Sequence, residues 1–224
     1  MAPRATSPTA APTRLSPEPG SIRNPAVGAL RLAFAALGTA ALITTLVQLL
    51  DRNGSAVNYF SFFTVLSNIL GVVVLCVGGI AQVRGGKPVG DYLRGATCLY
   101  LVITGLVSWT LLKNVELPEG QTWTNDVVHG VMPAVVLLDW LIIPPQRALQ
   151  ISRACYWLVF PVVYLAYSLI RGAAVNWYPY PFLDPRSKGY VHVTVMSLVV
   201  TVAFLVCTGL IVAVGNWLRA RRAA

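Results

Sequence analysis

Long apolar runs separated by short polar links dominate this sequence and restrict the folds that it can adopt. A helix of about 20 apolar residues crosses the hydrocarbon core of a bilayer, and the runs are of roughly that length. Only 11% of the residues are charged, compared with roughly 25% in a soluble domain. The sequence therefore predicts an all-α, polytopic membrane protein, a bundle of six transmembrane helices. The expected spans cover residues 27–50, 59–81, 92–112, 127–143, 154–170 and 190–218.

The segments outside the spans predict the domain organisation and the orientation in the membrane. Residues 1–24 are rich in Pro, Ala, Ser and Thr, which is typical of a disordered tail, and residues 25–224 are expected to form a single transmembrane domain. With the N-terminus inside, 12 of the 17 Lys and Arg residues fall in cytoplasmic segments. This bias predicts that both termini are cytoplasmic in a multi-pass protein of the plasma (inner) membrane. The net charge of +9 then follows from topology and attraction to anionic lipid, so no nucleic-acid partner is expected.

The second span opens with small and polar residues that share one helical face. Ser61, Thr64, Asn68 and Gly71 are spaced i, i+3, i+7 and i+10. A polar group facing hydrocarbon is costly, so this face is expected to turn toward protein, a cavity or a ligand. We predict that it forms one wall of a site, with Thr64 as its reactive member.

Both histidines of the chain are expected near the membrane depth of Thr64. His129 begins the fourth span, and Asp126, one turn earlier, is a candidate to orient its imidazole. Pro133 is expected to kink this span and free a backbone carbonyl. His192 begins the sixth span at the same outer level.

Aromatic residues and prolines alternate between the fifth and sixth spans, in residues 176–185. Such a run cannot form an α-helix, because proline removes backbone donors and restricts the residue before it. Aromatic rings are favourable at the membrane interface. We therefore expect a stiff, extended lid at the outer interface that contains Trp177 and Tyr178.

An acidic residue, Asp139, lies inside the fourth span toward its cytoplasmic side, where an unpaired charge would be expensive. One reading is a structural clamp, in which Asp139 pairs with an arginine from another span. The candidate partners are Arg31, Arg94, Arg147 and Arg153. The other reading, a proton or ion site, belongs to a transporter, and the clamp is the favoured reading. The four cysteines have no metal-ligand spacing, so neither a metal nor another cofactor is expected.

Polar side chains within the spans concentrate in the outer half of the predicted bundle. A channel would need polar lining through the whole thickness, whereas a pocket open to one leaflet needs it on one side only. The pattern therefore favours a pocket for an amphipathic ligand. Thr64 and His129 suit nucleophilic catalysis there, because a Thr hydroxyl needs a neighbouring base. The residues expected to bind substrate are Ser61, Asn68, Ser108, Tyr167, Arg171, Trp177, Tyr178 and His192. Asn68, Tyr167 and Arg171 are candidate donors to an oxyanion.

Three segments carry a resemblance to a known family. They are YFSFFTVLSN at residues 59–68, HGVMP at 129–133 with LDW at 138–140, and WYPYPFLD at 177–184. Together they resemble the bacterial Pr-six-Pr membrane proteins, which are similar in turn to the animal androgen-inducible and androgen-dependent membrane proteins. The animal members are threonine hydrolases that cleave fatty acid esters of hydroxy fatty acids. The resemblance implies that Thr64 is the nucleophile and His129 the base.

These observations predict an intramembrane hydrolase of lipid esters, whose partners are membrane lipids and an amphipathic ester substrate. Two other functions fit the same sequence. A transporter or lipid-binding protein would use Asp139 as a coupling site, and the absence of detectable inverted repeats counts mildly against it. A structural membrane partner would use the polar stripes only to hold helices together.

Overall fold

The computed structural model describes residues 23–113 and 122–223, and every element within these two ranges is helical. The described part contains six helical segments long and apolar enough to cross a membrane, which indicates a multi-pass membrane protein. In chain order they are α1 (Pro25–Asp51), α3 (Phe63–Arg84), α4 (Asp91–Leu111), the run of α5 (Thr122–Asp126), η1 (Val127–Val131) and α6 (Met132–Ile142), the run of α7 (Ile151–Ala154), η2 (Cys155–Leu158) and α8 (Val159–Val175), and α9 (Pro185–Ala223).

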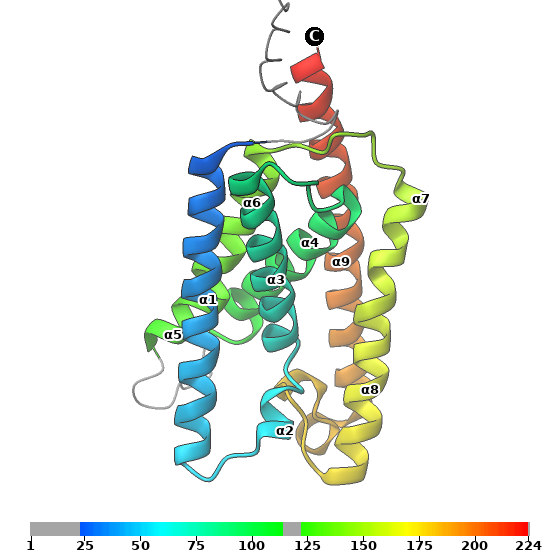
Figure 1. The fold of residues 1–224 in the computed structure, drawn as a ribbon. Coiled ribbons are helices and arrows are strands. Elements are labelled where there is room, and N and C mark those ends of the chain that lie inside the picture. Colours follow the sequence, from blue (N-terminus) through cyan, green and yellow to red (C-terminus); the bar gives the residue numbers. More distant parts are fainter. Residues whose placement is uncertain (1–22, 114–121, 224) are drawn as a thin grey trace, which may run out of the picture.

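Six crossings bring the two ends of the described chain to the same end of the bundle, at the top of Figure 1. We call this the terminal end. The opposite end carries the short helices α2 (Ala56–Tyr59) and η3 (Pro181–Leu183) and the beginning of α3. We call it the Thr64 end. The predicted tail of residues 1–24 lies outside the described residues except for Arg23 and Asn24, and Asn24 caps α1 by accepting a hydrogen bond from the Val27 N–H.

The second predicted span, residues 59–81, is wrong at its beginning. The helix α2 ends at Tyr59, and the Phe62 N–H bonds back to the Tyr59 carbonyl in a turn. Phe62 then adopts an extended conformation, with φ −81° and ψ 131°, so the membrane-spanning helix starts only at Phe63. Ser61 consequently lies outside the helix and does not share a helical face with Thr64.

Close contact between α1 and α3 depends on small residues. A Cβ atom on Gly28 would lie 2.8 Å from the carbonyl oxygen of Gly79, and one on Gly79 would lie 2.8 Å from Leu32 Cγ. Small residues let two membrane helices approach until their backbones touch, and the close approach strengthens van der Waals packing. This packing matters because the hydrophobic effect does not drive helices together inside a lipid bilayer. The glycines therefore fix the position of α3 against α1.

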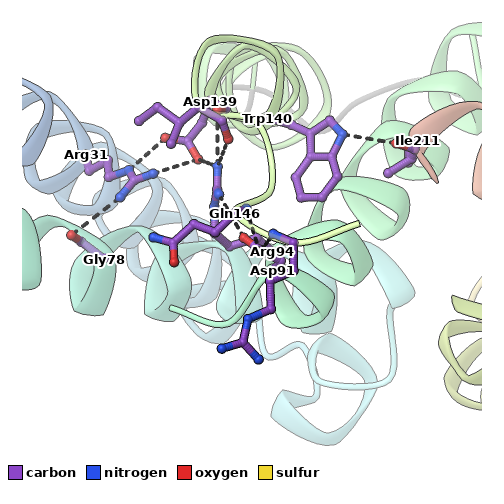
Figure 2. Close-up of polar contacts among 10 residues, drawn as sticks. Arg31, Gly78, Asp91, Arg94, Asp139, Trp140, Gln146 and Ile211 are labelled. Carbon is purple, nitrogen blue, oxygen red and sulfur yellow. Dashed lines mark hydrogen bonds and ion pairs between the residues drawn. The ribbon is translucent and has the colours of Figure 1, made fainter. Parts of the chain in front are cut away.

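An ion cluster holds three helices together near the terminal end (Figure 2). The α6 carboxylate of Asp139 lies 2.7 Å from Arg31 Nε on α1 and 3.0 Å from Arg94 Nη2 on α4. Both arginines are 7% exposed. The expected pairing of Asp139 is confirmed, with Arg31 and Arg94 as its partners, and neither Arg147 nor Arg153 forms an ion pair with it in the described structure. Paired in this way, the charges satisfy one another inside an apolar bundle.

An aromatic cluster lies directly beneath the start of α3. The ring of Phe63 packs within 6.0 Å, centroid to centroid, of four rings from three other helices. These are Tyr100, Phe160, Tyr164 and Phe204. The cluster joins α3 to α4, α8 and α9 and so fixes the height of the neighbouring residue, Thr64, in the bundle.

Candidate active site

Thr64 is the second residue of α3, so its backbone N–H is one of the donors that a helix leaves unpaired at its N-terminus. No side chain at the N-cap position accepts these donors. Two tyrosines from distant segments accept them instead: Tyr164 OH lies 3.1 Å from the Phe63 nitrogen, and Tyr180 OH lies 3.2 Å from the Thr64 nitrogen. Tertiary contacts, and not a local cap, thus define where this helix begins.

The hydroxyl of Thr64 and the imidazole of His129 meet as the sequence predicted. Thr64 Oγ1 lies 3.2 Å from His129 Nε2, and His129 Nδ1 lies 3.2 Å from the backbone carbonyl oxygen of Asn125. A carbonyl can only accept, so Nδ1 carries the proton and Nε2 is left free to accept one from Thr64. The partner of Nδ1 is therefore the Asn125 carbonyl, and the expected role of Asp126 is wrong.

The helix around His129 is irregular, as expected upstream of a proline. Residues Val127–Val131 form a π-helical turn. Pro133 has no N–H and cannot donate to the carbonyl four residues earlier, which favours a locally wider turn. The wider turn changes the direction in which His129 leaves the helix, and the histidine is brought against Thr64.

Tyr180 is the member of the site that the sequence did not identify. It is 8% exposed, and its hydroxyl lies 3.3 Å from Thr64 Oγ1 as well as accepting the Thr64 N–H. Burial raises the pKa of the Tyr180 phenol above its usual value, so the hydroxyl stays protonated at neutral pH. The signal for it was present: Tyr180 stands between Pro179 and Pro181, which restrict the backbone on both sides.

The hydrogen bonds around Thr64 form a chain with one direction. Tyr180 OH accepts from the Thr64 N–H and has its own proton to donate to Thr64 Oγ1. Thr64 Oγ1 in turn has its proton to donate to His129 Nε2. His129 Nδ1–H donates to the Asn125 carbonyl. The hydroxyl of Thr64 is thus aligned with a base that can take its proton.

Three of the predicted substrate-binding residues are held by structural contacts. Asn68 Nδ2 lies 2.9 Å from the Thr64 carbonyl and 3.0 Å from the Val128 carbonyl, so it joins α3 to η1. Ser61 donates to the Val57 carbonyl, and Tyr167 OH donates to Ser61 Oγ over 2.8 Å. None of these groups has a hydrogen bond to Thr64 Oγ1.

The aromatic lid is not extended throughout as predicted, because Pro181–Leu183 form the 3₁₀ helix η3, in which the Leu183 N–H donates to the Tyr180 carbonyl. Cation–π and hydrogen-bond contacts hold the lid to the Thr64 end. Arg171 lies 5.0 Å from the Trp177 ring centroid and donates to Asn58 Oδ1 over 2.6 Å. Tyr178 packs against Gly172, where an added Cβ would lie 2.1 Å from the ring. Of the predicted substrate-binding residues, Arg171, Trp177 and Tyr178 therefore support the lid. His192 is half-buried on α9 and lines neither of the two cavities described next.

Two cavities reach Thr64. The larger, about 450 Å³, is lined by Thr64, Tyr180, His129 and Ser108, together with Lys113 and Asn125. The smaller, about 160 Å³, lies among α3, α4, α8, α9 and η3. Its lining is mostly apolar and includes Phe63, Ile103, Val200 and Phe204. Thr64 and Tyr180 line both cavities, whereas His129 lines only the larger one.

The described residues contain no group of three His, Cys, Asp or Glu side chains that could hold a metal ion. Thr64, His129 and Tyr180 instead combine an aligned hydroxyl, a neutral base and two hydrogen-bond donors at the junction of two cavities. This set of groups is suited to acyl transfer. Comparisons of the chain with protein families, with curated proteins and with solved structures find no match.

Proposed function

We propose that this protein is an intramembrane hydrolase of lipid esters, with Thr64 as nucleophile and His129 as general base. The observation that carries the proposal is the 3.2 Å approach of Thr64 Oγ1 to His129 Nε2 on the wall of a cavity of about 450 Å³. The sequence resemblance to the Pr-six-Pr proteins supports the same assignment. By that resemblance, fatty acid esters of hydroxy fatty acids are the proposed substrate class.

The proposed reaction has two stages. Thr64 Oγ attacks the ester carbonyl carbon while His129 Nε2 takes the hydroxyl proton, and a tetrahedral oxyanion forms. The bond from carbon to the alcohol oxygen then breaks, and the imidazolium returns its proton to that oxygen. Water next attacks the acyl-threonine, again with His129 as base, and releases the carboxylic acid and free Thr64. The Asn125 carbonyl keeps Nδ1 protonated and stabilises the imidazolium between these steps.

The oxyanion has two donors within reach. The Thr64 N–H stands at the N-terminus of α3, where the helix dipole favours negative charge. The Tyr180 hydroxyl, kept protonated by its burial, is the second donor. In the free protein the Thr64 N–H donates to the Tyr180 oxygen, and the Tyr180 hydroxyl has its proton directed to Thr64 Oγ1. The substrate carbonyl oxygen would accept from both donors in place of these contacts.

The orientation of the proposed enzyme follows from the charge distribution. With both termini in the cytoplasm of a plasma (inner) membrane, the terminal end with its arginines faces inward. The Thr64 end then lies in the outer leaflet, beneath the aromatic lid. An amphipathic ester could reach the site from that leaflet with its polar part toward the interface.

A fluorophosphonate probe tests the nucleophile directly. We expect the purified wild-type protein to be labelled, with peptide mapping by mass spectrometry locating the adduct on Thr64. Thr64→Ala should abolish labelling, and Thr64→Ser should retain it because serine supplies the same hydroxyl. Undiminished labelling of Thr64→Ala would remove this residue from the chemistry and, with it, the proposed function.

Tyr180→Phe should lower kcat for ester hydrolysis by about 10²-fold, the usual loss when one oxyanion donor is removed. The phenylalanine ring keeps the packing of the lid, so KM should change much less. Tyr156→Phe is the matched control, because Tyr156 is 76% exposed on η2. Equal kinetics for Tyr180→Phe and the wild type would exclude the hydroxyl from transition-state stabilisation.

A further inference from the structure

The smaller cavity has no role in the site as described so far, although Thr64 and Tyr180 form part of its wall. Its lining includes the lid residues Tyr180 and Leu183 and, within the bundle, Ile103 and Phe204. On α9 its lining extends from Ser197 to Phe204, about 10 Å of helix rise. Phe204 contacts Phe63, with ring centroids 5.8 Å apart, so the aromatic cluster forms part of the cavity wall.

Geometry decides which part of an ester can occupy each cavity. The alcohol oxygen must lie next to His129 Nε2, because the imidazolium protonates it as it leaves. His129 lines only the larger cavity. The acyl group is attached to the other side of the carbonyl carbon, and the smaller cavity is the second space that reaches Thr64. Its mostly apolar lining suits a hydrocarbon chain.

We infer that the smaller cavity is the acyl-chain chamber of the proposed hydrolase and that Val200 and Phe204 limit the length of the chain it accepts. This inference rests on the proposed function. The alcohol part of the ester occupies the larger cavity, and Thr64 and Tyr180 stand at the junction. A cavity of about 160 Å³ holds a short alkyl chain such as octyl more readily than a hexadecyl chain.

The wall of the chamber also contains two buried hydroxyls without a hydrogen-bond partner among the described residues, those of Thr104 and Ser197, and Thr104 offers a test of what occupies the chamber. Thr104 is 4% exposed, and its Oγ1 has no hydrogen-bond partner among the described residues. A hydrocarbon chain in the chamber offers the Thr104 hydroxyl no hydrogen bond. Replacing the hydroxyl with a methyl group, as in Thr104→Val, should therefore favour binding of the chain, because it removes an unsatisfied buried polar atom. An occupant with a polar group in the chamber would instead depend on the hydroxyl.

The test uses n-alkyl fluorophosphonates from ethyl to hexadecyl, whose alkyl group stands for the acyl chain, and measures the rate of labelling at Thr64. We expect the octyl probe to label wild type faster than the ethyl or hexadecyl probes. Val200→Phe should slow octyl labelling about tenfold or more, while ethyl labelling changes little, because the added ring fills the chamber. Thr104→Val should increase octyl labelling about twofold.

Val199→Phe is the matched control, because Val199 is 52% exposed on the same helix and the substitution is identical. It should leave the chain-length profile unchanged. Three results would overturn the assignment of the smaller cavity to the acyl chain. They are an unchanged chain-length profile in Val200→Phe, a loss of octyl labelling in Thr104→Val, and a profile that is altered instead by Ser108→Phe in the larger cavity. Failure of every probe in the series to label Thr64 would overturn the proposed function itself, so the two failures are distinct.

Discussion

His129→Ala is expected to lower kcat for lipid-ester hydrolysis by roughly 10⁴-fold, the upper range for loss of a general base. The physical reason is the 3.2 Å contact between Thr64 Oγ1 and His129 Nε2, which no other base among the described residues can replace. A threonine hydroxyl that keeps its proton is a weak nucleophile. Steady-state kinetics on detergent-solubilised protein would measure the loss.

The matched control is His192→Ala, which removes the second histidine of the chain. His192 lines neither cavity, so its removal should leave kcat near the wild-type value. The double variant Thr64→Ala/His129→Ala should be no slower than either single variant, because residues that act as one unit have non-additive effects. Additive losses in the double variant would mean that Thr64 and His129 do not act in the same step.

The fold class could be predicted because it depends on length and hydropathy alone. Six apolar runs of the required length form six helices. Asp139 has arginine partners because an unpaired charge inside the bundle would be expensive, which is the reason the pairing could be predicted. The meeting of Thr64 with His129 also followed from their similar depth in two predicted spans. Each of these predictions depends on the cost of placing polar or charged groups in the hydrocarbon of the membrane, and this cost applies to every span in the same way.

The start of α3 could not be predicted, because its cause is tertiary. Phe60, Ser61 and Phe62 include neither glycine nor proline, so nothing local marks the break. The break is stabilised when tyrosine hydroxyls from α8 and from the lid accept the freed N–H groups of α3. Predicting it from sequence would have required knowing which tyrosines face this helix end.

The partner of the imidazole was missed for a related reason. The sequence offers Asp126 as a charged partner, but the Asn125 carbonyl takes the Nδ1 proton. Every residue has a backbone carbonyl, so sequence alone cannot distinguish the one that is aimed at a ring. Here the local π-helical turn sets the direction of His129, and only the folded backbone reveals it.

Asp139→Asn is expected to lower the free energy of unfolding by about 3–5 kcal/mol, the usual loss when one partner of a buried ion pair is removed. The variant leaves Arg31, which is 7% exposed, without a carboxylate partner, and it leaves Arg94 only the 3.7 Å ion pair with Asp91 on its own helix. Thermal unfolding in detergent would measure this as a large drop in Tm. Asp184→Asn is the surface control: its partner Arg186 is 53% exposed, so its Tm should change little.

A second variant separates unpaired charge from lost packing. The triple variant Asp139→Leu/Arg31→Met/Arg94→Met should recover much of the stability, because it removes both arginines together with the carboxylate between them, and Asp91 keeps its hydrogen bonds from the Gln146 and Arg147 N–H groups. The same proteins distinguish hydrolase from transporter. If Asp139 only clamps three helices, the folded fraction of Asp139→Asn keeps fluorophosphonate labelling at Thr64, which lies toward the other end of the bundle. If Asp139 couples transport, Asp139→Asn abolishes ligand movement while Thr64→Ala is tolerated. The ion cluster and Thr64 lie at opposite ends of the bundle, so these two outcomes cannot be confused.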